Sequence, residues 1–318
     1  MKNKKKQIVK WILLILLCFL MVGVYIRYNI PNYSHEVFGV TYMTMNNPFY
    51  EVIDNQLEKV IEANGDQLIT LDPSLDIDKQ IEQIRGFIRQ KVDGIFVNPV
   101  DSQAIVPVLR EAKAAGIPVF VLDTEIDEPG LADCTIVSDN YNAGVQCALD
   151  MMERKPQADI ILLRHSKVLS AAQRIQGFLD TIEGNPEYRI IDEAECEGQL
   201  ELAMPVMMEM LERNDHVDVV MALNDPSALG AMAALEQYGM NDAMVYGIDG
   251  TPDFKTLIGE NPKATGTVAQ SPMSIGATAA ELMYDRLAGK QIESRVIVPV
   301  YLVNFSGFLY IDSNSITT

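Results

Sequence analysis

The chain lacks the sequence motifs that mark most cofactor-dependent and metal-dependent enzymes. No two of its 20 glycines are separated by a single residue, so a G-x-G-x-x-G dinucleotide loop cannot be written on it. It also contains no G-x-x-x-x-G-K phosphate loop, no G-x-S-x-G nucleophile elbow and no H-E-x-x-H zinc pair. Its three histidines, His35, His165 and His216, are scattered, which leaves metal ligation and histidine-dependent catalysis without support. We therefore expect no cofactor, no metal site and no catalytic residues.

Cysteine is also scarce. Of the four cysteines, Cys18 lies in an apolar N-terminal run, and the other three, Cys134, Cys147 and Cys196, could form at most one disulfide. A disulfide scaffold is therefore excluded, and the sequence leaves open whether any of the three pair. Cys134 lies in an expected strand and Cys147 in an expected helix, so we predict that both are small buried hydrophobic residues.

Positive charge is sparse beyond the N-terminus. Residues 1–35 hold six Lys or Arg and no Asp or Glu, and the remainder holds 19 basic residues against 44 acidic ones, a formal charge of −25. Such an acidic surface repels phosphate backbones, which argues against nucleic-acid binding.

The N-terminal part contains one long apolar run. Sixteen apolar residues extend from Trp11 to Ile26, close to the ~20 residues that span a bilayer. The run is longer than the ~7 to 15 apolar residues of a cleavable secretory signal, and no small-x-small site follows it. Bulky residues, Leu16 and Leu17, precede Cys18 where lipid-processing sites have small ones, which argues against a lipoprotein anchor.

We therefore predict one transmembrane helix, an uncleaved signal anchor at residues 8–27. Residues 1–7 form a basic tail that should stay in the cytoplasm by the positive-inside tendency. Residues 28–35 are then a linker, and the rest of the chain is extracytoplasmic. The predicted location is the cell membrane, with a single pass.

The rest of the chain alternates short apolar runs with stretches of helical periodicity. This β-then-α order occurs three times before residue 139 and restarts after it, which predicts two doubly wound, Rossmann-like α/β lobes. In an open parallel sheet, ligands bind beyond the carboxyl ends of the strands. Polar groups stand at those ends here: Asn46-Asn47, Asn98, Asp123, Ser138-Asp139, Asn224-Asp225, Asp249 and Gln270. The pattern predicts a small-molecule site rich in hydrogen-bonding groups.

Several of these residues also have a purely structural explanation. Asn47 and Asn224 could simply cap the helices that follow them, and Asp249 could belong to a tight loop. Arg174, in an expected helix over residues 170–182, could be solvated. Asp123 has the strongest case for a ligand, because a carboxylate after an apolar run needs a hydrogen-bonding partner.

Eight segments, in order, resemble the ribose/galactose-type periplasmic solute-binding proteins of the type I periplasmic binding protein family: MNNPFY, FVNPVDS, VFVLD, IVSDN, AAQRIQGF, LNDPSALGAMAAL, YGIDGTPD and TVAQSP. The resemblance covers residues 36–318. It implies an N-terminal lobe of residues 36–138 plus 271–301 and a C-terminal lobe of residues 139–270 plus 302–318. Three crossovers would join the lobes near Ser138-Asp139, Gln270-Ser271 and Val300–Leu302.

The resemblance also implies a set of ligand contacts. Phe49 and Tyr50 would stack on the ligand, and Ser138 would lie at a hinge near it. The remaining contacts would form hydrogen bonds to a sugar ring and its hydroxyls: Asn47, Asn98, Asp123, Arg174, Asn224, Asp249 and Gln270.

Four positions depart from the family pattern. Thr124 stands where ribose binders have an arginine, Met43 where they have a small polar residue, and Cys196 and Ile248 where they have aromatics. These departures put ribose itself in doubt, and they leave a hexose, a deoxysugar, a polyol or a sugar-like signal open.

The expected function is that of an extracytoplasmic receptor whose lobes close on a monosaccharide or related small polyol, because the ligand contacts both lobes only in the closed state. The partner would be the permease of an ABC importer. The alternative partner is the ectodomain of a sensor kinase in a two-component system.

Two other classes of protein fit less well. A sugar-responsive repressor would need an N-terminal DNA-binding segment of ~50 to 60 mostly polar residues, where this chain has an apolar run. A glycosidase could use Asp123 and Asp249 as paired carboxylates, but the sequence offers no further nucleophile or base. We therefore expect a binding protein and not an enzyme.

Overall fold

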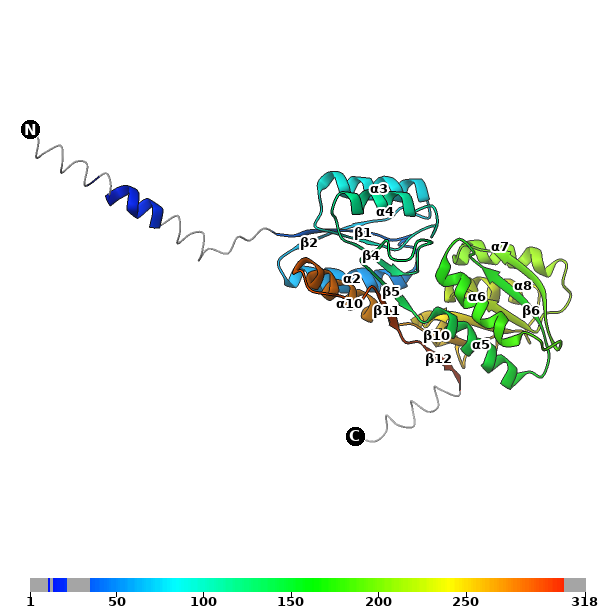
Figure 1. Cartoon of the computed structure of the whole chain (residues 1–318). Helices are drawn as coiled ribbons and strands as arrows, with labels where there is room; N and C mark the ends of the chain where they lie inside the picture. The colour runs from blue at the N-terminus through cyan, green and yellow to red at the C-terminus, as the bar shows by residue number, and fades with distance from the viewer. Residues whose placement is uncertain (1–10, 12–13, 22–34, 306–318) are drawn as a thin grey trace, which may run out of the picture. The chain divides into compact units, whose positions relative to one another are not determined.

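The computed structural model describes residues 11, 14–21 and 35–305 (Figure 1). The chain divides into two units, Met1–Glu36 and Val37–Thr318, and both β-sheets belong to the second. None of the helices in the described ranges combines the length and the apolar character that crossing a membrane requires. The predicted basic tail at residues 1–7, and much of the predicted anchor and linker, lie outside the described residues.

The first sheet contains six parallel strands in the order β11-β5-β4-β3-β1-β2. Its strands are β1 (Val37–Thr41), β2 (Gln67–Leu71), β3 (Gly94–Val97), β4 (Val119–Asp123), β5 (Cys134–Ser138) and β11 (Arg295–Val298). Helices α3 (Ile77–Gln90) and α4 (Val106–Ala114) cover one face, and α2 (Pro48–Ala63) and α10 (Pro272–Leu287) cover the other (Figure 1). We call this sheet and these helices the N-terminal lobe.

The second sheet also has six strands, in the order β12-β10-β9-β8-β6-β7. They are β6 (Ala158–Arg164), β7 (Tyr188–Glu195), β8 (Val219–Ala222), β9 (Met244–Asp249), β10 (Ala264–Ala269) and β12 (Tyr301–Asn304). Edge strand β12 runs antiparallel to β10, whereas the other pairs are parallel. This sheet and its helices form the C-terminal lobe: α5 (Asn140–Arg154), α6 (Leu169–Ile182), α7 (Leu200–Leu211), α8 (Asp225–Gln237) and α9 (Pro252–Leu257).

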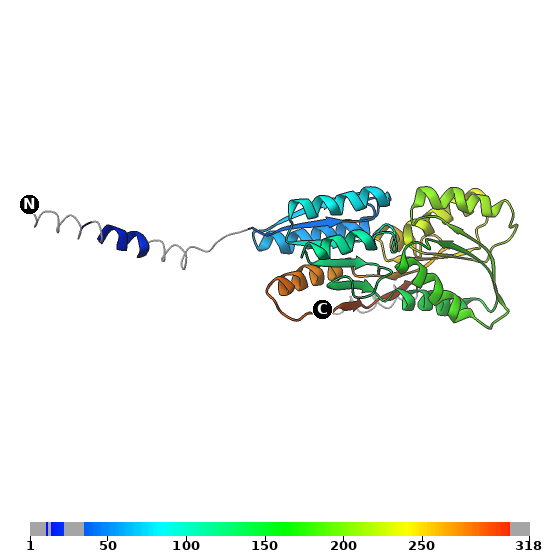
Figure 2. The same cartoon turned by 45° about the horizontal axis from the view of Figure 1, so that its top comes forward.

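Helices lie on both faces of each sheet, as Figure 2 shows from a second direction. Parallel strands covered in this way are buried on both faces, which explains the continuous apolar runs of the sequence. All five residues of β4 are buried, for example. The two-lobe α/β architecture predicted from the sequence is therefore confirmed.

The chain passes from one sheet to the other at three places. The first passage follows β5, which ends at Ser138, and leads into α5. The second follows β10, which ends at Ala269, and leads into α10 of the N-terminal lobe. The third is the short connection from Val298 to Tyr301 that joins β11 to β12. These passages place the carboxyl ends of central strands from both sheets on either side of one cleft.

Asparagines fix the start of the helices that follow β1 and β8. The Oδ1 atom of Asn47 accepts a hydrogen bond from the backbone N–H of Phe49 at 2.9 Å. The Oδ1 atom of Asn224 accepts one from the backbone N–H of Ser227 at 3.0 Å. A proline in the first turn of each helix lacks the N–H that would otherwise need a partner. Both asparagines therefore cap the helices that follow them, as their structural explanation predicts.

The buried cysteines agree with the sequence. Cys134, Cys147 and Cys196 are at most 1% exposed, and all four cysteines are free thiols. The prediction that Cys134 and Cys147 are small buried hydrophobic residues is therefore confirmed.

Candidate functional site

A cavity lies between the two lobes at the carboxyl ends of their strands. The empty space inside it, counted together with its open mouth, is about 410 Å³. Seven of the ten predicted contact residues line it: Asn47, Phe49, Tyr50, Asp123, Arg174, Asn224 and Asp249. The sequence positions of these residues span both halves of the chain, so the fold brings together groups that the sequence separates by up to about 200 positions.

The two aspartates at the centre of the cavity have the same local structure. Asp123 is the last residue of β4 and Asp249 is the last residue of β9, and their φ angles are +67° and +136°. Residues other than glycine rarely adopt positive φ, and such strain persists where the surrounding structure enforces it, often at functional sites. The strained backbone turns each carboxyl group from the strand end into the cavity.

Each of these carboxyl groups keeps one oxygen without a hydrogen bond. The side chains of Asp123 and Asp249 are almost fully buried, yet Asp123 Oδ1 and Asp249 Oδ2 accept no hydrogen bond from any described residue. Buried polar atoms nearly always have a partner, because leaving one unpaired costs about 1 to 3 kcal/mol. These two oxygens can accept hydrogen bonds from a ligand that enters the cavity.

Arg174 lies between the two aspartates. Its Nη2 is 3.9 Å from Asp123 Oδ1 and its Nη1 is 3.5 Å from Asp249 Oδ1. Charge-assisted N–H···O bonds are normally 2.7 to 2.9 Å long, so neither contact is a close ion pair. The guanidinium is instead held by Asn140 Oδ1, which accepts from Nε at 2.8 Å, and by the carbonyl of Leu223 at 3.0 Å. Arg174 can therefore donate to a ligand while remaining near both carboxylates.

Close packing of two helices fixes the position of Arg174. A Cβ atom on Gly144 of α5 would lie 1.8 Å from the Arg174 carbonyl oxygen. A Cβ atom on Gly177 of α6 would lie 2.0 Å from the Tyr141 carbonyl oxygen. Only glycine at positions 144 and 177 permits the two helices to approach so closely. This packing holds α6, which carries Arg174, against α5.

Burial makes the central carboxyl groups weak acids. Desolvation raises the pKa of Asp249 to about 8, Arg174 lowers it in part, and the neighbouring Asp225 and Asp123 raise it further. Desolvation also raises the pKa of Asp123, against the lowering effects of Arg174, Tyr50 and Asn98. Hydrogen bonds donated by a ligand favour the charged form of a carboxylate. Such a ligand would therefore replace the missing hydration of these groups.

Three predicted contacts lie outside the cavity lining. Asn98 Nδ2 donates to Asp123 Oδ2 at 3.4 Å and to the carbonyl of Leu122 at 3.2 Å. Gln270 Nε2 donates to Asp249 Oδ1 at 2.7 Å. Ser138, at the end of β5, is buried and its hydroxyl has no partner among the described residues. Asn98 and Gln270 thus orient the aspartate side chains without lining the cavity themselves.

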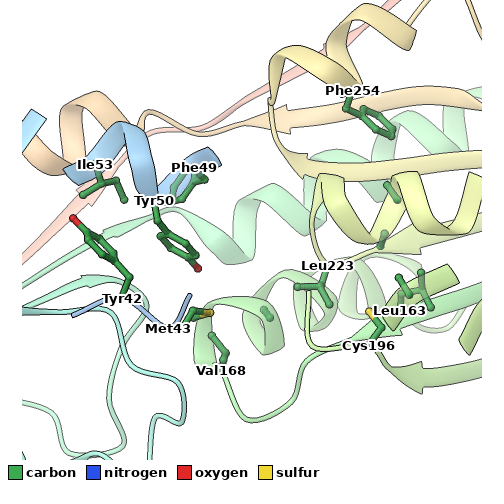
Figure 3. Packing of buried hydrophobic residues seen from close by; sticks show 14 of the residues in the cluster. Tyr42, Met43, Phe49, Tyr50, Ile53, Leu163, Val168, Cys196, Leu223 and Phe254 are labelled. Atoms are coloured by element: carbon green, nitrogen blue, oxygen red, sulfur yellow. The ribbon is translucent and has the colours of Figure 1, made fainter. Parts of the chain in front are cut away.

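Aromatic and apolar side chains form the remaining walls. The rings of Phe49 and Tyr50 pack edge to face with their centres 5.6 Å apart, and the Tyr50 hydroxyl donates to Asp123 Oδ2 at 3.4 Å. Figure 3 shows Met43 of the N-terminal lobe beside Val168 of the C-terminal lobe, with Leu223 opposite Tyr50. The cavity lining therefore contains apolar side chains as well as polar ones.

The four departures from the family pattern have different surroundings. Met43 lines the cavity, whereas the other three do not. Thr124 Oγ1 accepts a hydrogen bond from the backbone N–H of Ser170 at 2.9 Å. Cys196 lies 3.3 Å from the Ser227 hydroxyl, and Ile248 is fully buried in the core of the C-terminal lobe.

Several residues of the cavity lining are not among those predicted from the sequence. His165 and Gln199 follow the ends of β6 and β7, where the rule of polar strand ends also applies, and Ser170 and Glu197 lie close by. His165 is 6% exposed, and burial lowers its pKa, which favours the neutral ring. Gln199 Oε1 accepts a hydrogen bond from Asn46 of the other lobe at 2.8 Å.

The donor set does not suit a metal ion. Across residues 35–305 and the short described stretch before them, no group of three or more His, Cys, Asp or Glu side chains could hold one. The cavity instead combines hydrogen-bond acceptors, a guanidinium, amides and aromatic rings. Amides, carboxylates and guanidinium can bridge neighbouring hydroxyls, and rings pack on apolar C–H surfaces.

Known proteins share this sequence pattern and fold. The ribose import binding protein RbsB of Bacillus subtilis (strain 168) is 28% identical over 274 residues, 86% of this chain and 89% of the relative. Its counterpart from Escherichia coli (strain K12) is 29% identical over 273 residues, 85% of this chain and 91% of the relative. A solved ABC transporter solute binding protein from Mycobacterium smegmatis with bound glycerol superposes with a TM-score of 0.82 at 25% identity, covering 87% of this chain and 96% of the other. These relatives are binding proteins and not enzymes, and residues 38–291 match the family described as Periplasmic binding protein domain. The chain belongs to the periplasmic binding protein family.

Proposed function

We propose that this protein binds a monosaccharide or a closely related polyol between its lobes and delivers it to an ABC importer. The observation that carries the proposal is the pair of unpartnered oxygens, Asp123 Oδ1 and Asp249 Oδ2, on either side of Arg174. The Arg174 guanidinium lies 3.9 Å from Asp123 Oδ1 and 3.5 Å from Asp249 Oδ1, so two carboxylates and a planar donor lie close together and suit neighbouring hydroxyls. The rings of Phe49 and Tyr50 suit the C–H face of a sugar.

The proposed mechanism is closure of the two lobes on the ligand. Asp123 belongs to the N-terminal lobe, whereas Arg174 and Asp249 belong to the C-terminal lobe. A ligand that contacts all three gains its full affinity only when the lobes are together, so binding shifts the equilibrium toward the closed state. In this proposal the lobes are residues 36–138 plus 271–301 and residues 139–270 plus 302–318, with Ser138 at the hinge.

The relatives favour import over signalling. The two ribose relatives are named as import binding proteins, and the glycerol-bound one as part of an ABC transporter. This supports an ABC permease as the partner more than a sensor kinase. We further propose that residues 8–27 anchor the chain in the membrane with its binding domain outside the cytoplasm, on the basis of the apolar run of the sequence.

A thermal-shift screen of the purified full-length chain tests the proposal. The panel should contain pentoses, hexoses, deoxysugars and polyols. A ligand at ~100 times its dissociation constant stabilises the protein by roughly 2.7 kcal/mol, which raises the melting temperature of a protein of this size by several degrees. A panel in which no compound raises the melting temperature would contradict the proposal.

A further inference from the structure

Helix α6 carries Arg174 but does not cap its own N-terminus. The first N–H groups of an α-helix have no partner inside the helix and need one from elsewhere. The residue at the cap position of α6 is Val168, whose side chain cannot accept a hydrogen bond. The partners of the Leu169 and Ser170 N–H groups must therefore come from outside the helix.

Both partners come from the opposite lobe. Ser102, in the connection between β3 and α4, accepts a hydrogen bond through its Oγ from the Leu169 N–H at 3.2 Å. Thr124, which directly follows β4, accepts one through its Oγ1 from the Ser170 N–H at 2.9 Å. The Ser102 backbone N–H also donates to the Lys167 carbonyl at 3.1 Å. Two hydroxyls of the N-terminal lobe thus cap a helix of the C-terminal lobe.

These hydroxyls belong to a firmly held part of the N-terminal lobe. Ser102 is 4% exposed and Thr124 is fully buried. The Ser102 carbonyl accepts a hydrogen bond from the Asp127 N–H at 2.9 Å, which ties the connection after β3 to the one after β4. When the lobes separate, both caps are lost together and water must replace them.

The caps are adjacent to the proposed ligand contacts along both segments. Thr124 is the neighbour of Asp123, and Ser170 lies one helical turn before Arg174. The end of β4 therefore contacts α6 at two points. Thr124 caps the helix at Ser170, and Asp123 Oδ1 lies 3.9 Å from Arg174 Nη2. Closure that forms the caps also sets the distance between these two ligand-facing groups.

We propose that Ser102 and Thr124 are positioning residues that stabilise the closed state by capping α6 across the cleft. Neither side chain lines the cavity. The bonds need no ligand atom, so they favour closure both with and without a ligand. They change the affinity for every ligand by the same factor, so the rank order of the ligands stays the same. The effect on ligand affinity rests on the proposed function, whereas the effect on lobe closure does not.

Single-molecule fluorescence energy transfer between the lobes tests the proposal on the full-length chain. Fluorophores go on Lys59→Cys in α2 and on Glu212→Cys after α7, two exposed positions in opposite lobes. All samples carry Cys18→Ser, because Cys18 is exposed while the other three cysteines are buried. The test variants are Ser102→Ala, Thr124→Val and their combination.

Removing both caps should lower the ratio of closed to open molecules by about tenfold without any sugar, since each lost cap or buried hydrogen bond changes such a ratio several-fold. Thr124→Ser keeps the hydroxyl and should restore the parental ratio. The matched control is Thr181→Val on α6 itself, whose hydroxyl bonds only within its own helix.

A second readout uses D-ribose, D-allose and myo-inositol as probes. The affinity of whichever probes bind should fall by the same factor as the closed fraction, and their rank order should not change. An altered rank order with an unchanged closed fraction would overturn the proposal in favour of direct ligand contact. A closed fraction that is equal in the parental chain and the double variant would also overturn it, whatever the probes show. If no probe binds but the closed fraction falls, the proposal stands, and the thermal-shift panel decides the proposed function.

Discussion

Asp123 and Asp249 occupy equivalent places in the two lobes. Each is the last residue of the third strand in its sheet order, β4 in one sheet and β9 in the other. Each has a positive φ, is nearly fully buried, and keeps one carboxylate oxygen without a partner. The equivalence places one acceptor on each side of the cleft, with Arg174 between them.

Asp249→Asn should weaken sugar binding at least tenfold. A hydrogen bond to a charged group contributes about 1.5 to 3 kcal/mol, and the amide cannot match it. The same change should stabilise the ligand-free protein at pH 8 and above, because it removes a buried charge. Calorimetric titration and thermal melting measure the two effects. Asp253→Asn, at an exposed position four residues away, is the control and should change neither.

Sugar affinity should rise with pH up to about pH 8. Burial raises the pKa of Asp249 to about 8, and ligand hydroxyls that donate to the carboxylate lower it, so binding releases a proton below that pH. The affinity should therefore increase by up to about tenfold per pH unit and then level off. Titrations between pH 5.5 and pH 9 in buffers of different ionisation enthalpy measure the released proton. A flat profile would show that Asp249 does not face the ligand.

The stability of the ligand-free protein should depend on pH in the opposite direction. The pKa of Asp249 in the folded state, about 8, lies above its ordinary value of 3.8, so the folded state holds the proton more tightly. This contribution is complete below about pH 4 and is lost as the pH rises through about 8. The difference in the free energy of unfolding between the parental chain and Asp249→Asn, followed by denaturation from pH 4 to pH 9, isolates it. A difference that does not change with pH would contradict the prediction.

Gly177→Ala should displace Arg174 by disturbing the packing of α6 against α5. The added methyl group would lie 2.0 Å from the Tyr141 carbonyl oxygen and would force α6 away from α5. Overpacking of this kind costs about 1 to 3 kcal/mol, and displacement of Arg174 should also lower sugar affinity. Gly86→Ala in the interior of α3 is the matched control, since its nearest neighbour would be 3.8 Å away. That change should stabilise the protein by about 0.5 to 1 kcal/mol and leave binding intact.

Met43→Ser should favour more hydroxylated ligands. Met43 is an apolar residue of the cavity lining, and a ligand hydroxyl buried against it without a partner would cost about 1 to 3 kcal/mol. The ratio of the affinity for D-fucose to that for D-galactose should therefore fall in the variant. Met273→Ser, at an exposed position, is the control. A ratio that stays the same would place Met43 away from the ligand.

Local rules predicted the two lobes and the polar strand ends, whereas Phe49, Tyr50 and Arg174 were predicted as ligand contacts from the family resemblance. Apolar runs predict the buried strands, and polar residues at their carboxyl ends predict Asp123 and Asp249 in the cavity. The same rule also applies to His165 and Gln199, which follow strands β6 and β7 and line the cavity. The antiparallel edge strand β12 was not predicted, since its four residues carry no pattern that specifies direction.

Other features depend on distances that the sequence does not encode. Asn47 and Asn224 have the same sequence pattern whether they cap a helix or face a cavity, and in the fold they do both. Asn98 and Gln270 stand at strand ends like the aspartates, yet they donate hydrogen bonds to the aspartates and do not line the cavity. The contact of Thr124 with Ser170 requires both lobes to be placed first, so no local pattern could predict it.

A crystal structure of the protein with the sugar that most raises its melting temperature would test the central claim most directly. We predict ligand hydroxyls within about 2.5 to 3.0 Å of Asp123 Oδ1 and Asp249 Oδ2, and the ligand within reach of the Arg174 guanidinium. A ligand bound outside this cavity, or inside it with both oxygens still unpartnered, would contradict the account.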